Sequence, residues 1–204
     1  MLRKIWPRLA ALIFGLIILF VSMARASLVL IAQEGGTESL KNKEIMYKIN
    51  FLSGDTIETK YKFPEVGTLP DNPMYGFKRI RDYFWLYFSQ GEDKIKVSLL
   101  MADKNIVEFT ELTNREKYDL AIDSGNEGLD KLEYAYGLVN NLKKTDTQAK
   151  KLYQQVFMVG FAYKEVFRLA EKSYSFEAEK YSKLISRIND WNKEQEKNRY
   201  AWDF

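Results

Sequence analysis

The sequence predicts an all-α protein: an antiparallel bundle of about five helices, preceded by an N-terminal signal or anchor helix and by an extended arm or small β-hairpin. Two observations favour helices after residue 69, where apolar residues recur every three or four positions and helix-capping residues stand between the recurrences. A third concerns residues 45–63, where apolar and polar residues alternate as they do in strands. We therefore divide the chain into a signal peptide or membrane anchor (1–26), a linker with the arm or hairpin (27–68) and a helical bundle domain (69–204).

The first 26 residues have the pattern of an export segment. Three basic residues lie within positions 1–8, an uninterrupted apolar run covers 9–21, and Ala24-Arg25-Ala26 offers a small-x-small cleavage site. The run is shorter than the roughly 20 residues of a membrane span, which favours a cleaved signal peptide. The apolar stretch 28–32 leaves an uncleaved anchor as the alternative. Because the positive charges precede the apolar run, both alternatives place the rest of the chain outside the cytoplasm, either secreted or anchored to the cytoplasmic membrane.

The composition excludes several classes of site. The chain has no cysteine and no histidine, which removes disulfides, zinc sites with Cys or His ligands, thiol nucleophiles and His-based catalytic triads. The formal net charge is +3, but four of the 31 basic residues lie in the first 26 positions, and the remaining 27 face 28 acidic residues. A nucleic-acid-binding domain is therefore not expected. The sequence has neither a Gly-rich phosphate loop nor a Gly-x-Ser-x-Gly motif, and we predict no catalytic, cofactor-binding or metal-binding residue.

Two alternating runs precede the helical region. The runs 45–51 and 57–63 flank Ser53-Gly54-Asp55, a turn signal, and together they predict a β-hairpin. An isolated hairpin is marginally stable in water. It must therefore pack on the helices, or the segment remains a loosely extended arm.

The helical region opens with the segment Leu69-Pro70-Asp71-Asn72-Pro73-Met74-Tyr75. Pro70 keeps the residue before it out of the helical conformation, and Asp71 or Asn72 can cap the first free backbone N–H groups. Pro73 suits the first helical turn, where its missing N–H costs no hydrogen bond. We predict that the first helix begins at Pro73 and continues to about residue 88.

Four further helices are predicted. One opens after residue 91, one at the capping box Thr113-Asn114-Arg115-Glu116, one at the capping box Thr145-Asp146-Thr147-Gln148, and one at Ser175. The last carries Tyr181, Leu184, Ile188 and Trp191 at heptad spacing, the pattern of coiled-coil packing. Gly125 and Gly128 either break the third helix or mark a close helix crossing. The aromatic tail 200–204 is expected to fold back onto the bundle.

The segment Tyr83-Phe84-Trp85-Leu86-Tyr87-Phe88 is unusual for a helix. Six consecutive large apolar residues point all round the helix axis, so a single buried stripe cannot cover them. One interpretation is a central helix covered on several sides, in which a buried Phe84 would be essential for stability. The other is an exposed face that docks a partner or rests on a membrane surface, with Lys78, Arg79 and Arg81 as accessible charges one turn upstream.

The residues of the helix start also carry a resemblance. The segment 64–75 has the form Pro-x-x-Gly-x-Leu-Pro-Asp-x-Pro-x-Tyr and is followed by Lys78, Arg81-Asp82 and Ala102-Asp103-Lys104. In these residues the chain resembles a bacterial family of exported helical domains of unknown function. The resemblance implies an extracytoplasmic helical domain behind a signal or anchor, and it implies no catalytic residue. Gly76 departs from the bulky residue that the family usually has at that position.

The patterns together favour a non-catalytic, extracytoplasmic helical module of the bacterial cell envelope that mediates protein–protein interaction with an envelope partner. The alternatives are a membrane-surface or cell-wall-associated binding domain and, less favoured, an enzyme that works through carboxylates. No cofactor, metal or nucleic acid is expected. The candidate interaction residues are Leu69, Pro70, Asp71, Pro73, Tyr75, Lys78, Arg79, Arg81, Asp82 and Trp85.

Overall fold

The computed structural model of the chain describes residues 44–50, 56–65 and 67–202. The chain divides into two units, 1–39 and 40–204, and all described residues belong to the second. The predicted signal or anchor segment, its cleavage site and the spacer after it therefore also lie outside the described residues. Within the described ranges, no helix combines the length and the apolar character that a membrane crossing requires.

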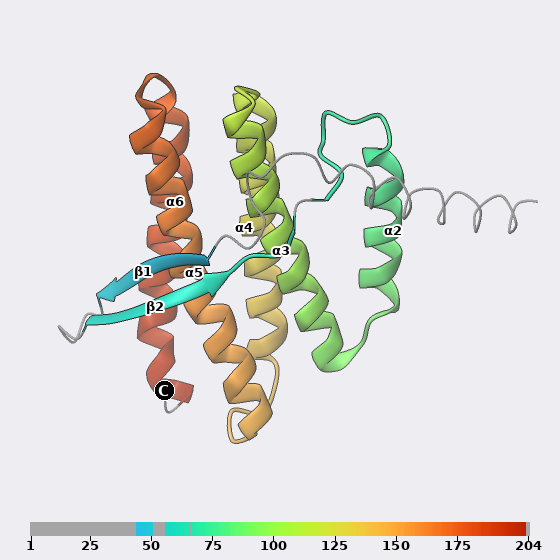
Figure 1. The fold of residues 1–204 in the computed structure, drawn as a ribbon. Coiled ribbons are helices and arrows are strands. Elements are labelled where there is room, and N and C mark those ends of the chain that lie inside the picture. The colour runs from blue at the N-terminus through green and yellow to red at the C-terminus, as the bar shows by residue number, and fades with distance from the viewer. Residues whose placement is uncertain (1–43, 51–55, 66, 203–204) are drawn as a thin grey trace, which may run out of the picture. The chain divides into compact units, whose positions relative to one another are not determined.

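The second unit is mostly helical and carries one small antiparallel hairpin, as the sequence predicts (Figure 1). The hairpin consists of β1 (Glu44–Asn50) and β2 (Thr56–Lys62), with Ile49 opposite Ile57. The helices are α2 (Tyr75–Phe88), α3 (Gly91–Asn114), α4 (Tyr118–Asn140), α5 (Thr147–Ser173) and α6 (Ala178–Asn198). Two short 3₁₀ helices, Ser175–Glu177 and Arg199–Trp202, flank α6.

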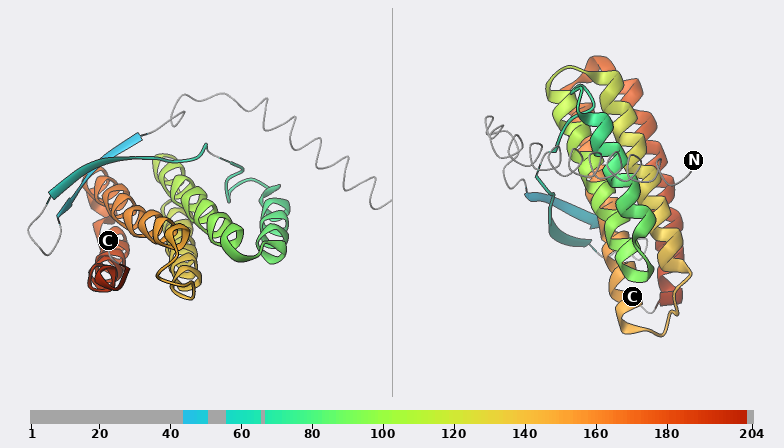
Figure 2. Two further views of the ribbon diagram at one scale, coloured as in Figure 1. Left: turned by 90° about the horizontal axis from the view of Figure 1, so that it is seen from below. Right: turned by 90° about the vertical axis from the view of Figure 1, so that its right-hand side faces the viewer.

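Helices α3 to α6 lie side by side, and the chain reverses direction at each turn between them (Figure 1). The views along and across the helices in Figure 2 show that the hairpin crosses one face of this body, whereas α2 stands at its edge. α3 packs mainly on α4, α5 packs mainly on α6, and α2 packs chiefly on α3. The core therefore lies between α3, α4, α5 and α6, and α2 is peripheral.

The hairpin is part of this core rather than a loose arm. Its residues Tyr47 and Ile49 are buried, and the Tyr47 hydroxyl donates a hydrogen bond of 3.1 Å to the carbonyl of Met158 in α5. Alternation places these side chains on one face of the hairpin, so that face is covered by the helices. Burial raises the pKa of Tyr47 to about 12, so its hydroxyl stays protonated as a donor at neutral pH.

Close helix crossings explain the glycines of the predicted helices. A Cβ atom at Gly125 would lie 2.9 Å from Leu184 Cδ1, and one at Gly128 would lie 2.8 Å from Ile106 Cδ1. α4 runs unbroken through both positions, so the second of the two alternatives is correct. The predicted heptad residues Tyr181, Leu184, Ile188 and Trp191 are all buried.

Several predicted helix starts need correction. α2 begins at Tyr75, and the Asn72 side chain accepts a 2.8 Å hydrogen bond from the Met74 N–H in the turn before it. The capping box at Thr113 is wrong, because α3 continues through this buried residue and the next helix starts only after a turn. α5 is capped by Asp146, whose side chain accepts a 2.7 Å hydrogen bond from the Gln148 N–H. Burial in the bundle can thus extend a helix through residues that would otherwise start a new one, because local helix propensity is weak by comparison.

The tail returns to the bundle as far as it is described. Trp202 is buried and its ring stacks on Tyr153 at a centroid distance of 4.8 Å. Tyr200 is exposed. Among the tail residues that the structure describes, Trp202 is therefore the aromatic residue that holds the fold-back.

Candidate functional site

Helix α2 is oriented opposite to an ordinary surface helix. Lys78 is the one buried residue of this helix, and the large apolar residues around it are exposed or half-buried. The interpretation as a central helix covered on several sides is therefore wrong. α2 instead presents a polar face to the bundle and an apolar face to solvent.

The inner face of α2 is held by a buried charge network. The Lys78 ammonium pairs with the Glu108 carboxylate of α3, and the Tyr75 hydroxyl donates a 2.9 Å hydrogen bond to the same carboxylate. Asp82 lies 3.9 Å from the ammonium on its other side. Burial raises the pKa of Glu108, whereas Lys78 and the Tyr75 hydroxyl act to lower it. Because a buried carboxylate needs such partners, the network fixes how α2 sits on α3.

The outer face of α2 is defined here as Phe77, Ile80, Tyr83, Phe84, Tyr87 and Phe88. These residues are exposed, from 48% for Phe84 to 71% for Phe88. Tyr83 stacks on Tyr87 and Phe84 on Phe88, each pair with ring centroids 6.2 Å apart. At roughly 200 Å² per aromatic side chain, about 600 Å² of largely apolar surface faces solvent. That area reaches the upper end of the largest patches on ordinary monomers, about 300–600 Å².

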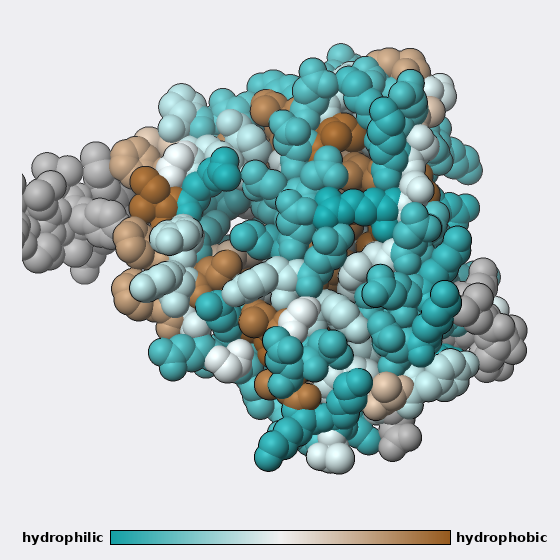
Figure 3. All heavy atoms as spheres, turned by 180° about the vertical axis from the view of Figure 1, so that it is seen from behind, coloured by the Kyte–Doolittle hydropathy of each residue, from teal (hydrophilic) through white to brown (hydrophobic). Residues whose placement is uncertain are grey.

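Figure 3 shows the molecule from behind, so the α2 edge lies at the left, where hydrophobic residues gather. The rest of this face is predominantly hydrophilic. The apolar surface is therefore a local feature of the α2 edge and does not extend over the whole of the visible face.

The basic residues of α2 are not free charges as the sequence suggested. Lys78 is buried, which corrects the expectation that it is accessible. Arg79 lies 3.5 Å from Glu127 of α4, and Arg81 lies 2.7 Å from Asp82. Both exposed arginines are thus paired within the chain, and the outer face carries little net charge.

A groove of about 800 Å³ runs beside the outer face, between α2 and the bundle. Ile80, Tyr83 and Phe84 form its α2 wall, while Met101 and Asn105 of α3 line its other side. The ionisable side chains that line it are balanced in sign: Lys78, Arg79 and Lys131 against Asp82, Glu127 and Asp130. The groove thus joins an apolar wall to a polar rim of mixed charge.

No family model, curated protein or solved structure matches this chain. The family resemblance drawn from the residues of the helix start consequently stays a prediction.

The predicted interaction residues fall into two groups. Tyr75, Lys78, Arg79 and Asp82 line the groove, and Arg81 and Trp85 are exposed on α2. The others shape the approach to the helix: Leu69 is buried, Asp71 lies 2.7 Å from Lys117 Nζ, and Pro70 and Pro73 lie in the turn region.

Sequence reasoning missed which residues form the outer face. Phe77, Ile80, Phe84 and Phe88 repeat at three or four positions, which predicts a single stripe, and Tyr75, Lys78 and Asp82 form the opposite polar stripe. The two stripes were visible in the sequence. Which of them faces the bundle depends on Glu108, which is distant in the chain.

A second buried polar cluster holds the hairpin. Asp103 of α3 accepts hydrogen bonds from the Tyr163 hydroxyl of α5 at 2.8 Å and from the Tyr61 hydroxyl of β2 at 2.8 Å. Burial raises the pKa of Asp103 to about 7, while the two tyrosine hydroxyls act to lower it. No group of potential metal ligands occurs among the described residues. Asp103 thus links three elements through partners that already occupy it.

Proposed function

We propose that this chain is a non-catalytic interaction module that binds a protein partner through the outer face of α2 and the groove beside it. The single observation that carries the proposal is the reversed orientation of α2, which keeps Lys78 inside and its aromatic rings outside. A helix in water normally buries its apolar stripe. The reversed arrangement leaves a surface whose burial by a partner is favourable.

The chemistry of the surface fits a protein interface. Aromatic residues are enriched in the parts of interfaces that contribute most to binding, and a polar rim normally surrounds them. The outer face supplies the rings, and the balanced charges of the groove supply the rim. An amphipathic helix of the partner would fit this combination, because helix-in-groove recognition needs one apolar wall and flanking polar groups.

The balanced charge favours a protein over a lipid surface. Anionic membranes attract clusters of unpaired Lys and Arg. Here Arg79 and Arg81 are already paired, and the positive and negative side chains that line the groove balance, so the site offers no cluster of unpaired basic residues. The membrane-surface alternative rests on the aromatic residues alone, which also suit a membrane interface.

The arrangement of the buried carboxylates also speaks for a non-catalytic role. Asp103 accepts hydrogen bonds from tyrosine hydroxyls of β2 and α5, whereas Glu108 accepts one from a tyrosine hydroxyl of α2. Glu111 and Glu196 are buried as well, and Glu111 pairs with Arg115 at 2.9 Å. Asp103, Glu108 and Glu111 thus each have partners within the chain, whereas an acid–base pair would have to face one substrate.

The proposed location is the cell envelope, outside the cytoplasm, and it is supported by the charge and hydropathy of residues 1–26 alone. N-terminal sequencing of the protein from its native cells tests this part. A start at Ser27 indicates cleavage, and a start at Met1 in the membrane fraction indicates an anchor. A full-length soluble protein in the cytosol would contradict the proposed location.

Site-specific crosslinking tests the proposed binding surface. A photo-crosslinking amino acid replaces Phe84 in the full chain, expressed in the cells that produce it, and Lys183 of α6 is the control position because it is also exposed. We expect a discrete protein adduct from position 84 and none of the same mass from position 183. Adding Tyr87→Ser and Phe88→Ser should reduce the adduct at least about tenfold, because hot-spot rings are needed for affinity.

Three other outcomes are informative. Adducts of equal yield from both positions, or adduct formation that is insensitive to the two serines, would exclude the outer face as the binding surface. An adduct of the chain with itself would identify a second copy as the partner. Co-sedimentation with phospholipid vesicles that disappears with the two serines would favour the membrane-surface alternative.

A further inference from the structure

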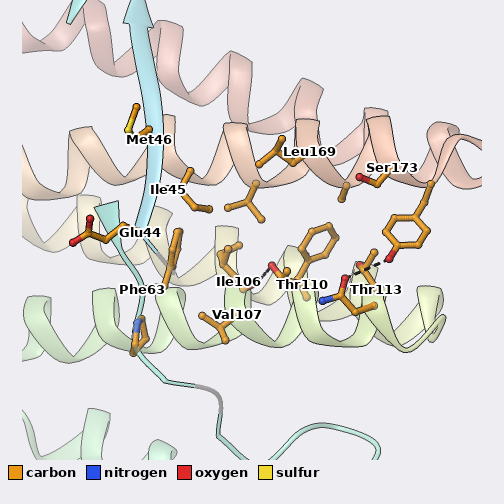
Figure 4. Close-up of a pocket in the computed structure, with 16 residues that line it drawn as sticks. Glu44, Ile45, Met46, Phe63, Ile106, Val107, Thr110, Thr113, Leu169 and Ser173 are labelled. Carbon is orange, nitrogen blue, oxygen red and sulfur yellow. Dashed lines mark hydrogen bonds between the residues drawn. The ribbon is translucent and has the colours of Figure 1, made fainter. Parts of the chain in front are cut away.

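A second cavity lies on the other side of α3 from the buried network of α2. It has a volume of about 330 Å³ and lies between α3 and α5, with the hairpin at one end (Figure 4). Figure 4 shows Ile106 and Thr110 of α3 across the cavity from Leu169 and Ser173 of α5, with Ile45 of β1 near them. None of the residues that line it belongs to α2, so the cavity is independent of the proposed interaction surface.

The cavity is apolar over most of its length. Ile106 and Val107 of α3 line it together with Val166 and Ala170 of α5. Phe63 lines the hairpin end. The volume lies at the lower end of small-molecule sites, which are about 300–1,000 Å³. Dry apolar cavities of about half this size bind small apolar molecules in other proteins.

The end away from the hairpin is polar but uncharged. Thr110, Thr113, Asn114, Ser173 and Tyr174 line it. The Tyr174 hydroxyl donates a 3.3 Å hydrogen bond to Asn114 Oδ1, so its lone pairs can accept, and the Asn114 amide nitrogen can donate. A ligand hydroxyl or amide could therefore both donate and accept at this end.

The charges of the lining side chains favour a neutral ligand over an ionic one. Glu44, at the hairpin end, is the single charged side chain among the described residues that line the cavity. An anionic ligand such as a fatty-acid carboxylate would find no cation among the described residues that line the cavity. Its head group could keep water at the end where Asn114 and Ser173 are exposed, so the missing cation is what disfavours it. A neutral ligand needs no such cation.

We propose that this cavity binds one small neutral molecule with an apolar body and a single hydroxyl or amide group. The apolar body lies between Ile106 and Leu169, and the polar group meets Asn114 and Tyr174. Medium-chain alcohols have this chemistry.

Fluorescence of N-phenyl-1-naphthylamine, a neutral apolar probe, tests the proposal on the full chain. We expect probe binding that 1-decanol displaces at a concentration at least tenfold lower than decanoate does at pH 8, because decanol carries no charge. The Asn114→Leu variant should lose most of this preference, since the polar end then offers no amide. Equal displacement by the alcohol and the carboxylate would contradict the assignment of a neutral ligand.

Cavity-filling variants show where the probe binds. Ala170→Leu fills the apolar part, and Lys172→Leu is the matched control, because it adds the same residue at an exposed position of the same helix. Thr110→Leu is a second filling variant in case the first does not fold, and a circular dichroism melt monitors folding. We expect at least a tenfold loss of probe affinity in a folded filling variant and none in the control.

The aromatic outer face of α2 could also bind the probe, so the Tyr87→Ser/Phe88→Ser variant is titrated in parallel. Probe binding that survives in the filling variants but disappears with the two serines would overturn the proposed site. Absence of probe binding to the unaltered chain would overturn it as well. Neither result would affect the crosslinking test of the α2 surface, so the two proposals fail independently.

Discussion

Replacing Lys78 by methionine should loosen α2 from the bundle. Lys78 is 9% exposed and pairs with Glu108, which is 1% exposed. Methionine keeps much of the length of the side chain but removes the charge. Among the described residues, Glu108 would then retain the Tyr75 hydroxyl as its partner in a site without a cation. A buried carboxylate in that position is unfavourable unless it takes up a proton or becomes exposed to water.

The magnitude follows from how α2 is attached. Removing one member of a buried ion pair generally costs about 3–5 kcal/mol. Because α2 packs chiefly on α3, it can separate locally and let water reach Glu108, which limits the loss. We therefore expect the lower end, about 3 kcal/mol, and a decrease in Tm of about 6–12 °C for a chain of this size.

Urea unfolding followed by circular dichroism measures the loss, and hydrogen exchange locates it. Amides of α2 should exchange faster in Lys78→Met than in the unaltered chain, and amides of α4 should change less. The double variant Lys78→Met/Glu108→Leu should recover most of the stability, since apolar replacement of a buried pair is often neutral. Arg79→Met is the matched control on the same helix, and it should cost less than about 1 kcal/mol because its pair with Glu127 is exposed.

The reasoning would be refuted by a Lys78→Met variant that unfolds within about 0.5 kcal/mol of the unaltered chain, the usual range for surface substitutions. It would be refuted equally by a loss in Arg79→Met that matches the loss in Lys78→Met. Either result would mean that the network with Glu108 does not hold α2. The orientation of α2 would then need another cause.

Three further predictions concern stability. Phe84→Ala should cost less than about 1 kcal/mol in thermal unfolding, against about 3–5 kcal/mol for a buried ring, because Phe84 is 48% exposed. A cost above 3 kcal/mol would show that its ring is covered. Gly160→Ala should cost about 1–3 kcal/mol, since its Cβ would lie 2.4 Å from Trp191 Cζ3, whereas Gly137→Ala, which meets nothing within 4 Å, should be neutral or stabilising. Equal effects of the two alanines on the urea midpoint would contradict the close crossing. Finally, the pKa of Asp103 is raised to about 7 in the folded chain from about 3.9 unfolded, so the folded state binds the proton more tightly. Its contribution to stability is complete below pH 4 and is lost as the pH rises through 7. Asp103→Asn should remove this part of the pH dependence, and a curve parallel to that of the unaltered chain would contradict the assignment.

Much of the fold was predictable from local patterns. Tyr181, Leu184, Ile188 and Trp191 repeat at a spacing that allows one buried stripe, and all four are buried. Alternation in the segment 45–63 predicted the hairpin, because a period of two puts side chains on opposite faces of a strand. These patterns depend on neighbours in the chain, so the sequence carries them directly.

The exact helix ends were less predictable. Thr113 has the residues of a capping box after it, yet it lies inside α3 and is buried. Asp71 looked like a cap and instead pairs with Lys117 at 2.7 Å. Thr113 is buried in the bundle, and Asp71 pairs with a residue on another part of the chain. Local propensity is too small to prevail over such packing and pairing.

The candidate site shows most clearly which features follow from local sequence patterns and which depend on tertiary contacts. The sequence by itself determined that residues 75–88 form a helix with large apolar residues all round its end, and its polar residues Tyr75, Lys78 and Asp82 also share one side of the helix. Periodicity indicates which residues share a face but does not indicate which face packs on the bundle. Only the tertiary structure decided that, since it brings the carboxylate of Glu108 on α3 to the polar stripe, where Lys78 and the Tyr75 hydroxyl supply the partners that a buried charge requires.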